Sequence, residues 1–190
     1  MMWRGTFNTY RRIEGELLDR MDAAEKARPD LISIDPDFEY PDYLRAQDIH
    51  LQPGSYQDDP LAGFVFQYGS KVFFTGGNDD DKLHNVMVEW VPIEGTPERI
   101  VDLGCGVGQS TTAFKQRLPG AEVHGVDIAA PMLRYAHARA RDLSIEVHFS
   151  QQDAADLTYE DNSVDAVMAM ILFHELPQDV TRKVVSEAAR

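Results

Sequence analysis

Three closely spaced glycines carry the clearest chemical signal in this chain. Gly104, Gly106 and Gly108 follow the apolar run at residues 100–103 and precede a helical pattern that starts at Ser110. A glycine lacks a Cβ, so the main chain can bend sharply there or let a ligand approach closely. The first turn of the following helix offers unpaired N–H groups. The pattern favours a nucleotide-like ligand over a tight strand-to-helix connection that binds nothing.

The spacing of the glycines separates two classes of nucleotide site. The fingerprint of dinucleotide-binding folds is G-x-G-x-x-G, whereas this chain carries G-x-G-x-G and has Gln109 in place of the last glycine. Residues 101–108, VDLGCGVG, resemble instead the first motif of class I S-adenosylmethionine-dependent methyltransferases. The resemblance implies S-adenosyl-L-methionine as cofactor and S-adenosyl-L-homocysteine as product. It implies cofactor contacts from Asp102, Gly104, Cys105, Gly106 and Gly108.

Two acidic residues follow later strands. Asp127 ends the second apolar strand, and it and the next residue, Ile128, are predicted to contact the cofactor. A carboxylate there accepts hydrogen bonds from both hydroxyls of a ribose. Nicotinamide-dependent enzymes use the same arrangement, so Asp127 alone leaves that class open. By the resemblance, Asp153 reaches the exocyclic amine of adenine and the N–H of Ala154 meets a ring nitrogen. Asp153 is preferred over its neighbour Asp156, and an ordinary turn residue is the alternative reading.

The loop after the fourth predicted strand contains Phe173, His174 and Glu175. Ligands of this fold lie outside the carboxyl ends of the strands, so this loop is expected near the methyl donor. His174 is the candidate general base, because the pKa of a free imidazole lies near neutrality. The alternative of equal weight is a histidine that only holds the loop. Phe173 and Glu175 are predicted to contact substrate.

A Pro-Gly turn in the N-terminal part is flanked by His50 and Tyr56. These two residues are predicted to contact substrate from a lid segment that closes over it, with plain loop packing as the alternative. A zinc-protease motif is excluded, because Gln178 stands where H-E-x-x-H requires its second histidine. The sequence therefore predicts no metal site.

Strands alternating with helices between residues 96 and 190 predict an α/β fold with a Rossmann-like, doubly wound parallel sheet. The expected strands are residues 100–103, 121–127, 145–149 and 163–171, and the expected helices are residues 110–118, a helix from Pro131, and residues 178–190. The last strand is almost wholly apolar, which is typical of a parallel strand covered on both faces.

Residues 1–95 are predicted to form a mainly helical extension that caps the substrate site of a domain at residues 96–190. Helical spacing predicts a helix over residues 9–28, and prolines predict a looping segment over residues 29–59. The apolar run at residues 61–68 favours a helix over a strand, with Gly76-Gly77 at its end. Asn78 or Asp79 is expected to cap a further helix that runs to about Val91.

Composition excludes several function classes. The 190 residues carry a formal charge of −14, so the basic stripe that nucleic-acid binding requires is absent and no nucleic-acid partner is expected. The single cysteine, Cys105, rules out an internal disulfide. No apolar segment reaches the length of a membrane span or resembles a signal peptide, which predicts a cytoplasmic protein without a membrane partner.

Together these features predict a methyltransferase that acts on oxygen, nitrogen or carbon of a small-molecule acceptor. The first alternative is a non-catalytic module that keeps the nucleotide fold for binding or assembly. The second is a nicotinamide-dependent oxidoreductase, which Gln109 disfavours.

The resembling family builds its sheet from about seven strands in the order 3-2-1-4-5-7-6, whereas four are predicted here. The sequence therefore predicts a domain truncated after the fourth strand, which either pairs with another chain through its apolar edge, as in a homodimer, or is left from a longer chain that was trimmed after folding. The alternative is that residues 1–95 cover this edge.

Overall fold

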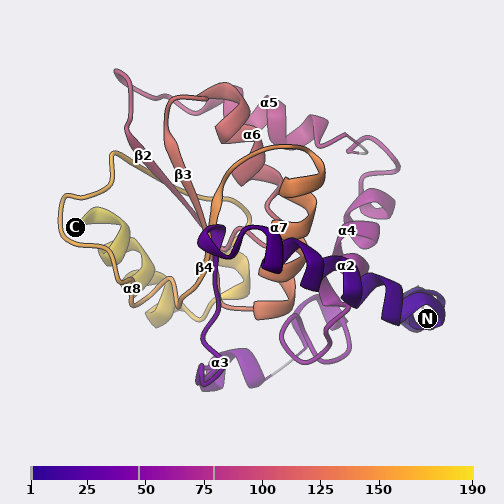
Figure 1. Cartoon of the computed structure of the whole chain (residues 1–190). Coiled ribbons are helices and arrows are strands. Elements are labelled where there is room, and N and C mark those ends of the chain that lie inside the picture. The colour runs from indigo at the N-terminus through magenta and orange to yellow at the C-terminus, as the bar shows by residue number, and fades with distance from the viewer. Residues whose placement is uncertain (1, 47, 79) are drawn as a thin grey trace.

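Five parallel strands form the sheet around which the rest of the chain folds (Figure 1). The computed structural model describes residues 2–46, 48–78 and 80–190. The strands are β1 (Ile32–Ser33), β2 (Arg99–Leu103), β3 (Glu122–Asp127), β4 (His148–Gln151) and β5 (Ala166–Ala169). They lie in the order β1-β4-β3-β2-β5 and pair in parallel. The four predicted strands thus lie in the order 3-2-1-4, and the predicted doubly wound fold is confirmed.

The sheet differs from the prediction on its β4 side. β1 was not predicted, because a strand of two residues is too short to show alternation of apolar and polar side chains. In the structure its Ile32 pairs with Phe149 of β4. The third strand, expected over residues 145–149, begins only at His148. Ile145 still belongs to the end of the preceding helix, since its N–H donates to the carbonyl of Ala140 at 2.9 Å. The apolar pattern therefore placed this strand three residues too early.

The fourth strand is much shorter than the predicted residues 163–171. Before it, the carboxylate of Asp165 accepts the N–H groups of Glu98 at 2.7 Å and Arg99 at 2.8 Å. After it, Ile171 adopts a positive φ of 58°, which turns the chain out of the strand. Within the described residues, β5 pairs only with β2, so the prediction that it forms an edge is confirmed for that part of the chain. Its pairing with another chain stays a prediction.

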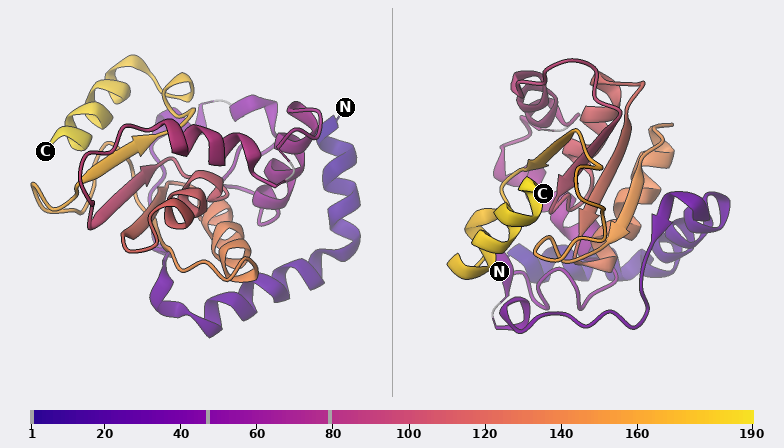
Figure 2. Two further views of the ribbon diagram at one scale, coloured as in Figure 1. Left: turned by 90° about the horizontal axis from the view of Figure 1, so that it is seen from above. Right: turned by 90° about the vertical axis from the view of Figure 1, so that its left-hand side faces the viewer.

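Helices cover both faces of the sheet (Figure 2). On one face, α6 (Gln109–Arg117) and α7 (Ala130–Asp142) pack against β2, β3 and β4, with α5 (Lys82–Trp90) beside α6; α8 (Gln178–Ala189) covers the other face. Successive side chains of β2 point to opposite faces of the sheet. Ile100 therefore packs on the first face and Val101 on the second. The predicted helices that follow the strands are confirmed within one residue or two at each end.

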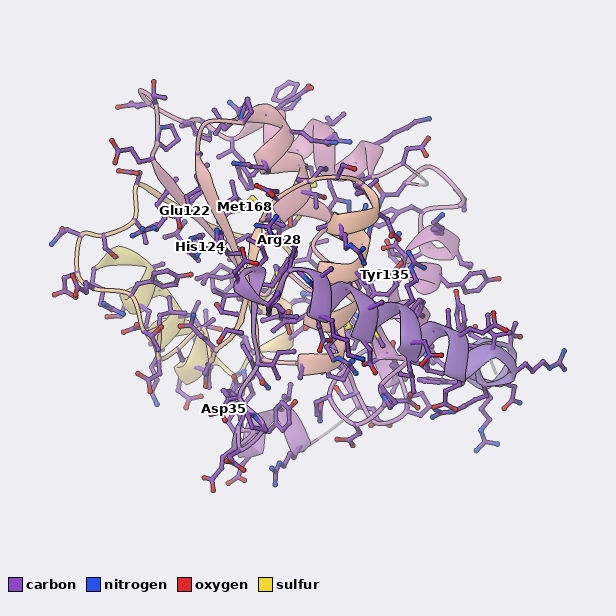
Figure 3. The ribbon with its side chains drawn as sticks, viewed as in Figure 1. Arg28, Asp35, Glu122, His124, Tyr135 and Met168 are labelled. Carbon is purple, nitrogen blue, oxygen red and sulfur yellow. The ribbon has the colours of Figure 1, made fainter. Side chains whose placement is uncertain are left out.

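The N-terminal helices pack on α7. The predicted helix over residues 9–28 is instead α1 (Met2–Tyr10), a 3-10 turn (Arg11–Ile13) and α2 (Glu14–Ala27), because Ile13 leaves helical geometry with φ −124° and ψ 21°. Arg134 of α7 pairs with two carboxylates of α2, Asp22 and Glu25. α4 (Ala62–Phe73) approaches α7 so closely that a Cβ on Gly63 would lie 2.3 Å from Tyr135, which is labelled in Figure 3. The apolar run that starts near Leu61 is therefore a helix, as predicted.

Short elements complete the chain. They are α3 (Asp42–Arg45) and the 3-10 turns Pro29–Leu31, Ile49–Leu51 and Phe173–Glu175. The predicted cap at Asn78 lies too early, because the residue at the N-cap of α5 is Asp81. Asn78 still supports the start of the helix, since its Oδ1 accepts the N–H of Leu83 at 3.0 Å. The alternative cap, Asp79, lies outside the described residues. Among the described helices, none is both long enough and apolar enough to cross a membrane.

Candidate active site

A cavity of about 610 Å³ lies at the carboxyl ends of the parallel strands. Residues from the N-terminal segment and from the loops after β2, β3, β4 and β5 form its walls. Eleven predicted site residues line it: His50, Tyr56, Gly104, Cys105, Gly106, Asp127, Ile128, Asp153, Ala154, His174 and Glu175. Three further predicted residues, Asp102, Gly108 and Phe173, are described but do not line it.

The glycine turn needs each of its glycines for a different reason. All three have positive φ: 65° at Gly104, 54° at Gly106 and 73° at Gly108. A Cβ on Gly108 would lie 2.9 Å from Phe149 in the core, and a Cβ on Gly104 would lie 2.8 Å from Leu172. A Cβ on Gly106 would meet only Met132, at 3.6 Å. Gly106 is therefore the position at which a ligand can approach the main chain.

Asp102 lies behind the turn and is fully buried. Its Oδ2 accepts hydrogen bonds from the hydroxyls of Ser110 at 2.6 Å and Thr111 at 2.7 Å. Burial raises the pKa of Asp102 to about 6, although the two hydroxyl donors lower it. The contacts fix the first turn of α6 against β2, so Asp102 acts on the cavity through the position of that turn.

Asp127 holds the glycine turn open from the neighbouring strand. One carboxylate oxygen accepts the N–H of Gly106 at 2.8 Å, and the other accepts the N–H of Ala129 at 2.8 Å. Burial raises the pKa of Asp127, while these main-chain donors lower it. Each carboxylate oxygen has room for a second donor, so hydroxyl groups of a ligand in the cavity still find acceptors.

Asp153 combines the two roles that the sequence left open. Its Oδ1 accepts the N–H of Ala155 at 2.8 Å, which is a turn contact, and the residue also lines the cavity. The hydroxyl of Tyr43 donates to the same oxygen at 3.4 Å. Asp156 is exposed and does not line the cavity. The preference for Asp153 over Asp156 therefore agrees with the position of the two side chains.

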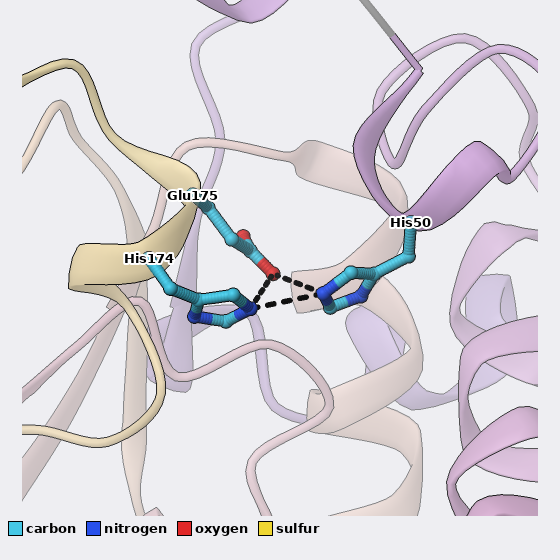
Figure 4. A group of neighbouring side chains, drawn as sticks. All are labelled: His50, His174 and Glu175. Carbon is cyan, nitrogen blue, oxygen red and sulfur yellow. Dashed lines mark hydrogen bonds and ion pairs between the residues drawn. The ribbon is translucent and has the colours of Figure 1, made fainter.

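Four predicted residues form one group although the sequence separates them by up to 125 residues. The Nε2 atoms of His50 and His174 lie 2.9 Å apart, and Oε1 of Glu175 lies 3.6 Å from the first and 3.8 Å from the second (Figure 4). The hydroxyl of Tyr56 lies 2.8 Å from Nδ1 of His50. Phe173 stands apart from this group and lines a second, smaller hollow beside α8.

The electrostatics of the cavity are set by acidic groups. Asp127, Asp153 and Glu175 line it, and no lysine or arginine does so in the part of the chain that the structure describes. Burial, with the charge of Asp127 as a second cause, raises the pKa of Glu175 to about 8. Burial and the neighbouring His174 lower the pKa of His50. The cavity therefore favours neutral or cationic ligands and disfavours anions.

The cavity has two unlike walls. The strand-end wall consists of the residues at the carboxyl ends of β2, β3 and β4: Gly104, Cys105, Gly106, Asp127, Ile128, Asp153 and Ala154. The aromatic wall comes from the N-terminal segment and consists of Trp3, Tyr43, Tyr56, Phe66, Phe73 and Phe74. Apart from Tyr56, sequence reasoning missed the aromatic wall. The one sequence feature that could have indicated this wall is the pair Phe66 and Phe73, which are two helical turns apart and therefore lie on one face of α4.

Gln109 joins the glycine turn to the N-terminal segment. Its buried side chain donates to Oδ1 of Asp81 at 2.6 Å, just before α5 begins, and Arg139 of α7 pairs with the same carboxylate. The residue that breaks the dinucleotide fingerprint thus connects the glycine turn to the start of α5.

Comparison with known proteins agrees with this geometry. Residues 100–190 match the family model described as a methyltransferase domain. Demethylmenaquinone methyltransferase of Thermus thermophilus is 44% identical over 75 residues, which are 40% of this chain and 34% of that protein. The chain thus spans about a third of the length of this curated relative.

Solved structures of the same kind have a similar fold. A Methanococcus maripaludis protein described as an S-adenosylmethionine-dependent methyltransferase superposes with a TM-score of 0.59 at 17% identity, over 70% of this chain and 58% of that one. Geranyl diphosphate methyltransferase, solved with GPP and sinefungin, superposes with a TM-score of 0.50 at 25% identity, over 57% of this chain and 39% of that one.

Proposed function

Residues 100–190 belong to the class I S-adenosylmethionine-dependent methyltransferases, and from this premise we propose that the chain methylates oxygen, nitrogen or carbon of a small-molecule acceptor. The observation that carries the proposal is the cavity in which the glycine turn, Asp127 and Asp153 meet beneath the His50–His174–Glu175 group. The cofactor is S-adenosyl-L-methionine, as in the related methyltransferases.

The residues of the strand-end wall fit this cofactor. Gly106 leaves open space where a Cβ would stand, and Asp127 keeps acceptor capacity for ribose hydroxyls. The carboxylate of Asp153 suits the exocyclic amine of adenine. The carboxylates of Asp127 and Asp153 suit a ligand with a positively charged sulfur, because no lysine or arginine lines the cavity in the described part of the chain.

When bound, S-adenosyl-L-methionine supplies a methyl group on a positively charged sulfur, which leaves with the electron pair of the broken carbon–sulfur bond. The acceptor atom forms the new bond to the methyl carbon and gives up its proton. We place His174 as the residue that activates the acceptor, by receiving this proton at Nε2. Holding the acceptor in line is expected to supply most of the barrier reduction.

The aromatic wall supports an acceptor that is neutral and largely apolar. Tyr56 and Phe66 pack edge to face, with ring centroids 5.5 Å apart, and give that wall a fixed apolar surface. A polyanionic acceptor would find carboxylates and no lysine or arginine among the described lining residues. Residues 1–95 would then act as a cap that excludes water and selects the acceptor, with His50 and Tyr56 on its inner side.

Calorimetric titration with S-adenosyl-L-homocysteine tests the proposal first. Binding is expected for the folded chain, and no heat at millimolar ligand would refute it. A screen of neutral phenols and amines with isotopically labelled methyl donor tests the acceptor, with polycarboxylates as matched negative controls. Tight cofactor binding without turnover on any acceptor would favour a non-catalytic binding module instead.

A further inference from the structure

We propose that His50, His174 and Glu175 form a binding site for a divalent transition-metal ion at the acceptor end of the cavity. This inference rests on the proposed function only for the use of the ion, not for the site itself. The three ligand atoms come from the N-terminal segment and from the loop after β5, and they face one another across the cavity (Figure 4).

The distances fit a metal ion. The triangle formed by the two Nε2 atoms and Oε1 of Glu175 has sides of 2.9, 3.6 and 3.8 Å. Its centre lies about 2.0 Å from all three corners, which is the usual distance from a zinc-type ion to imidazole nitrogen or carboxylate oxygen. An ion slightly above this plane would keep ligand distances close to 2.1 Å and leave further positions open toward the cavity.

A proton shared between the two histidines is the alternative explanation. It accounts for the 2.9 Å separation of the Nε2 atoms, while Glu175 lies too far from either nitrogen for a hydrogen bond. A cation would join all three ligand atoms. The ring centroids lie 5.2 Å apart, so the two Nε2 atoms point almost directly at each other and both rings must turn toward Glu175 to bind an ion. Both imidazoles are nearly half exposed, which leaves room for this turn.

Tyr56 supplies the supporting contact that metal-bound histidines usually have. Its hydroxyl lies 2.8 Å from Nδ1 of His50 and also hydrogen-bonds to Glu175. When the hydroxyl donates to the carboxylate and accepts from Nδ1, the lone pair of Nε2 is left free for a metal. Tyr56 is buried, so this contact holds two of the three ligands in place.

The donor set selects the kind of ion. Two imidazoles and one carboxylate suit zinc, cobalt, iron or manganese better than magnesium or calcium, which prefer oxygen ligands alone. Three protein ligands with open positions are typical of a catalytic rather than a structural site. There the ion would polarise the hydroxyl of an oxygen acceptor and lower its pKa, and His174 would act as a ligand instead of receiving the proton itself.

A second group with the same side chains offers a matched control. Glu122, His124 and His148 lie at the amino ends of β3 and β4, and Figure 3 labels the first two. There the carboxylate is already neutralised, because Arg99 donates to Glu122 from Nε at 3.0 Å and from Nη2 at 2.9 Å. These residues do not line the cavity. This group is therefore expected to bind metal weakly or not at all.

The test is titration of the chelator-treated full chain with Co²⁺ followed by visible absorption, and with Zn²⁺ followed by calorimetry. We expect one ion per chain, with affinity lowered at least about tenfold in both His174→Ala and His50→Ala. His148→Ala should bind as the wild type does. Far-UV circular dichroism of each variant checks that it is folded.

Two results would overturn the proposal. One is the absence of binding by the folded wild-type chain at millimolar Co²⁺ and Zn²⁺, which would leave a shared proton as the explanation of the histidine pair. The other is binding that His148→Ala removes and His174→Ala does not. Titration with S-adenosyl-L-homocysteine separates the two proposals, because metal binding without cofactor binding would refute the proposed function alone.

Discussion

The two walls of the cavity are built by different means. The strand-end wall depends on main-chain geometry: two glycines with positive φ, Gly104 and Gly106, and an aspartate whose two oxygens fix the turn. The aromatic wall works through side chains, which helices of the N-terminal segment place over the cavity. The first wall suits a ligand common to a family, and the second suits an acceptor particular to one protein. Variants of the two walls should therefore change different measured quantities.

Replacement of the histidine between the walls should have the largest effect. His174→Ala is expected to lower turnover about 100-fold or more, whether His174 receives the acceptor proton or holds a cation that acidifies it. Its affinity for S-adenosyl-L-homocysteine should stay within about twofold of the wild type, because the strand-end wall is unchanged. Steady-state kinetics and calorimetry on the same preparation measure both.

His148→Ala is the control for this variant, since its imidazole lies at the opposite ends of the strands. If His174→Ala lost the cofactor as severely as a variant of the strand-end wall, the division of roles between the walls would be wrong.

A change in the strand-end wall should weaken cofactor binding. Asp127→Ala removes an acceptor for ribose hydroxyls and the contact that holds Gly106, and the expected loss is about 1–3 kcal/mol of binding free energy. This corresponds to a Kd that rises about 5-fold to 150-fold. Asp156→Ala, at an exposed position outside the cavity, should bind as the wild type does. Equal affinities in the wild type and Asp127→Ala would show that the ribose lies elsewhere.

A change in the aromatic wall should act on the acceptor alone. Phe66→Leu removes a ring that lines the cavity beside Tyr56, and the contact of such a ring with an aromatic acceptor is worth about 0.5–1.5 kcal/mol. We expect the KM of a neutral aromatic acceptor to rise about 2-fold to 10-fold, with unchanged affinity for S-adenosyl-L-homocysteine. A variant that instead lost cofactor affinity would show that Phe66 belongs with the strand-end wall.

The difference between the two walls also explains which parts of the site could be predicted from the sequence. The glycine turn, Asp127 and the order of the four main strands were readable because each depends on local spacing, whereas the bounds of the third and fourth strands differed from the prediction. The aromatic wall depends on how α4 packs on α7, where Gly63 lies against Tyr135, and no local pattern encodes that contact. The group at His50 and His174 was predicted as separate residues, but its geometry required two segments to meet. The H-E-x-x-H rule finds metal sites within one helix and misses such a group.

The smallest expected effect is a difference in how the two walls respond to acid. His84 lines the cavity from α5, and burial lowers its pKa to about 4. The histidine of the unfolded chain, with a pKa of about 6.5, is protonated before that of the folded chain. The free energy of unfolding therefore decreases as pH falls from about 6.5 toward 4. Between pH 7 and pH 6 this loss is about 0.7 kcal/mol.

Asp102, behind the strand-end wall, responds in the opposite direction. Its pKa is raised to about 6, so protonation favours the folded chain and stability rises by about 0.3 kcal/mol between pH 7 and pH 6. Urea unfolding at the two pH values measures the difference. Compared with the wild type, His84→Gln should lose about 0.7 kcal/mol less stability between pH 7 and pH 6, and Asp102→Asn should lose about 0.3 kcal/mol more. If both variants kept the pH dependence of the wild type, neither group would remain buried in the ionisation state assigned to it here.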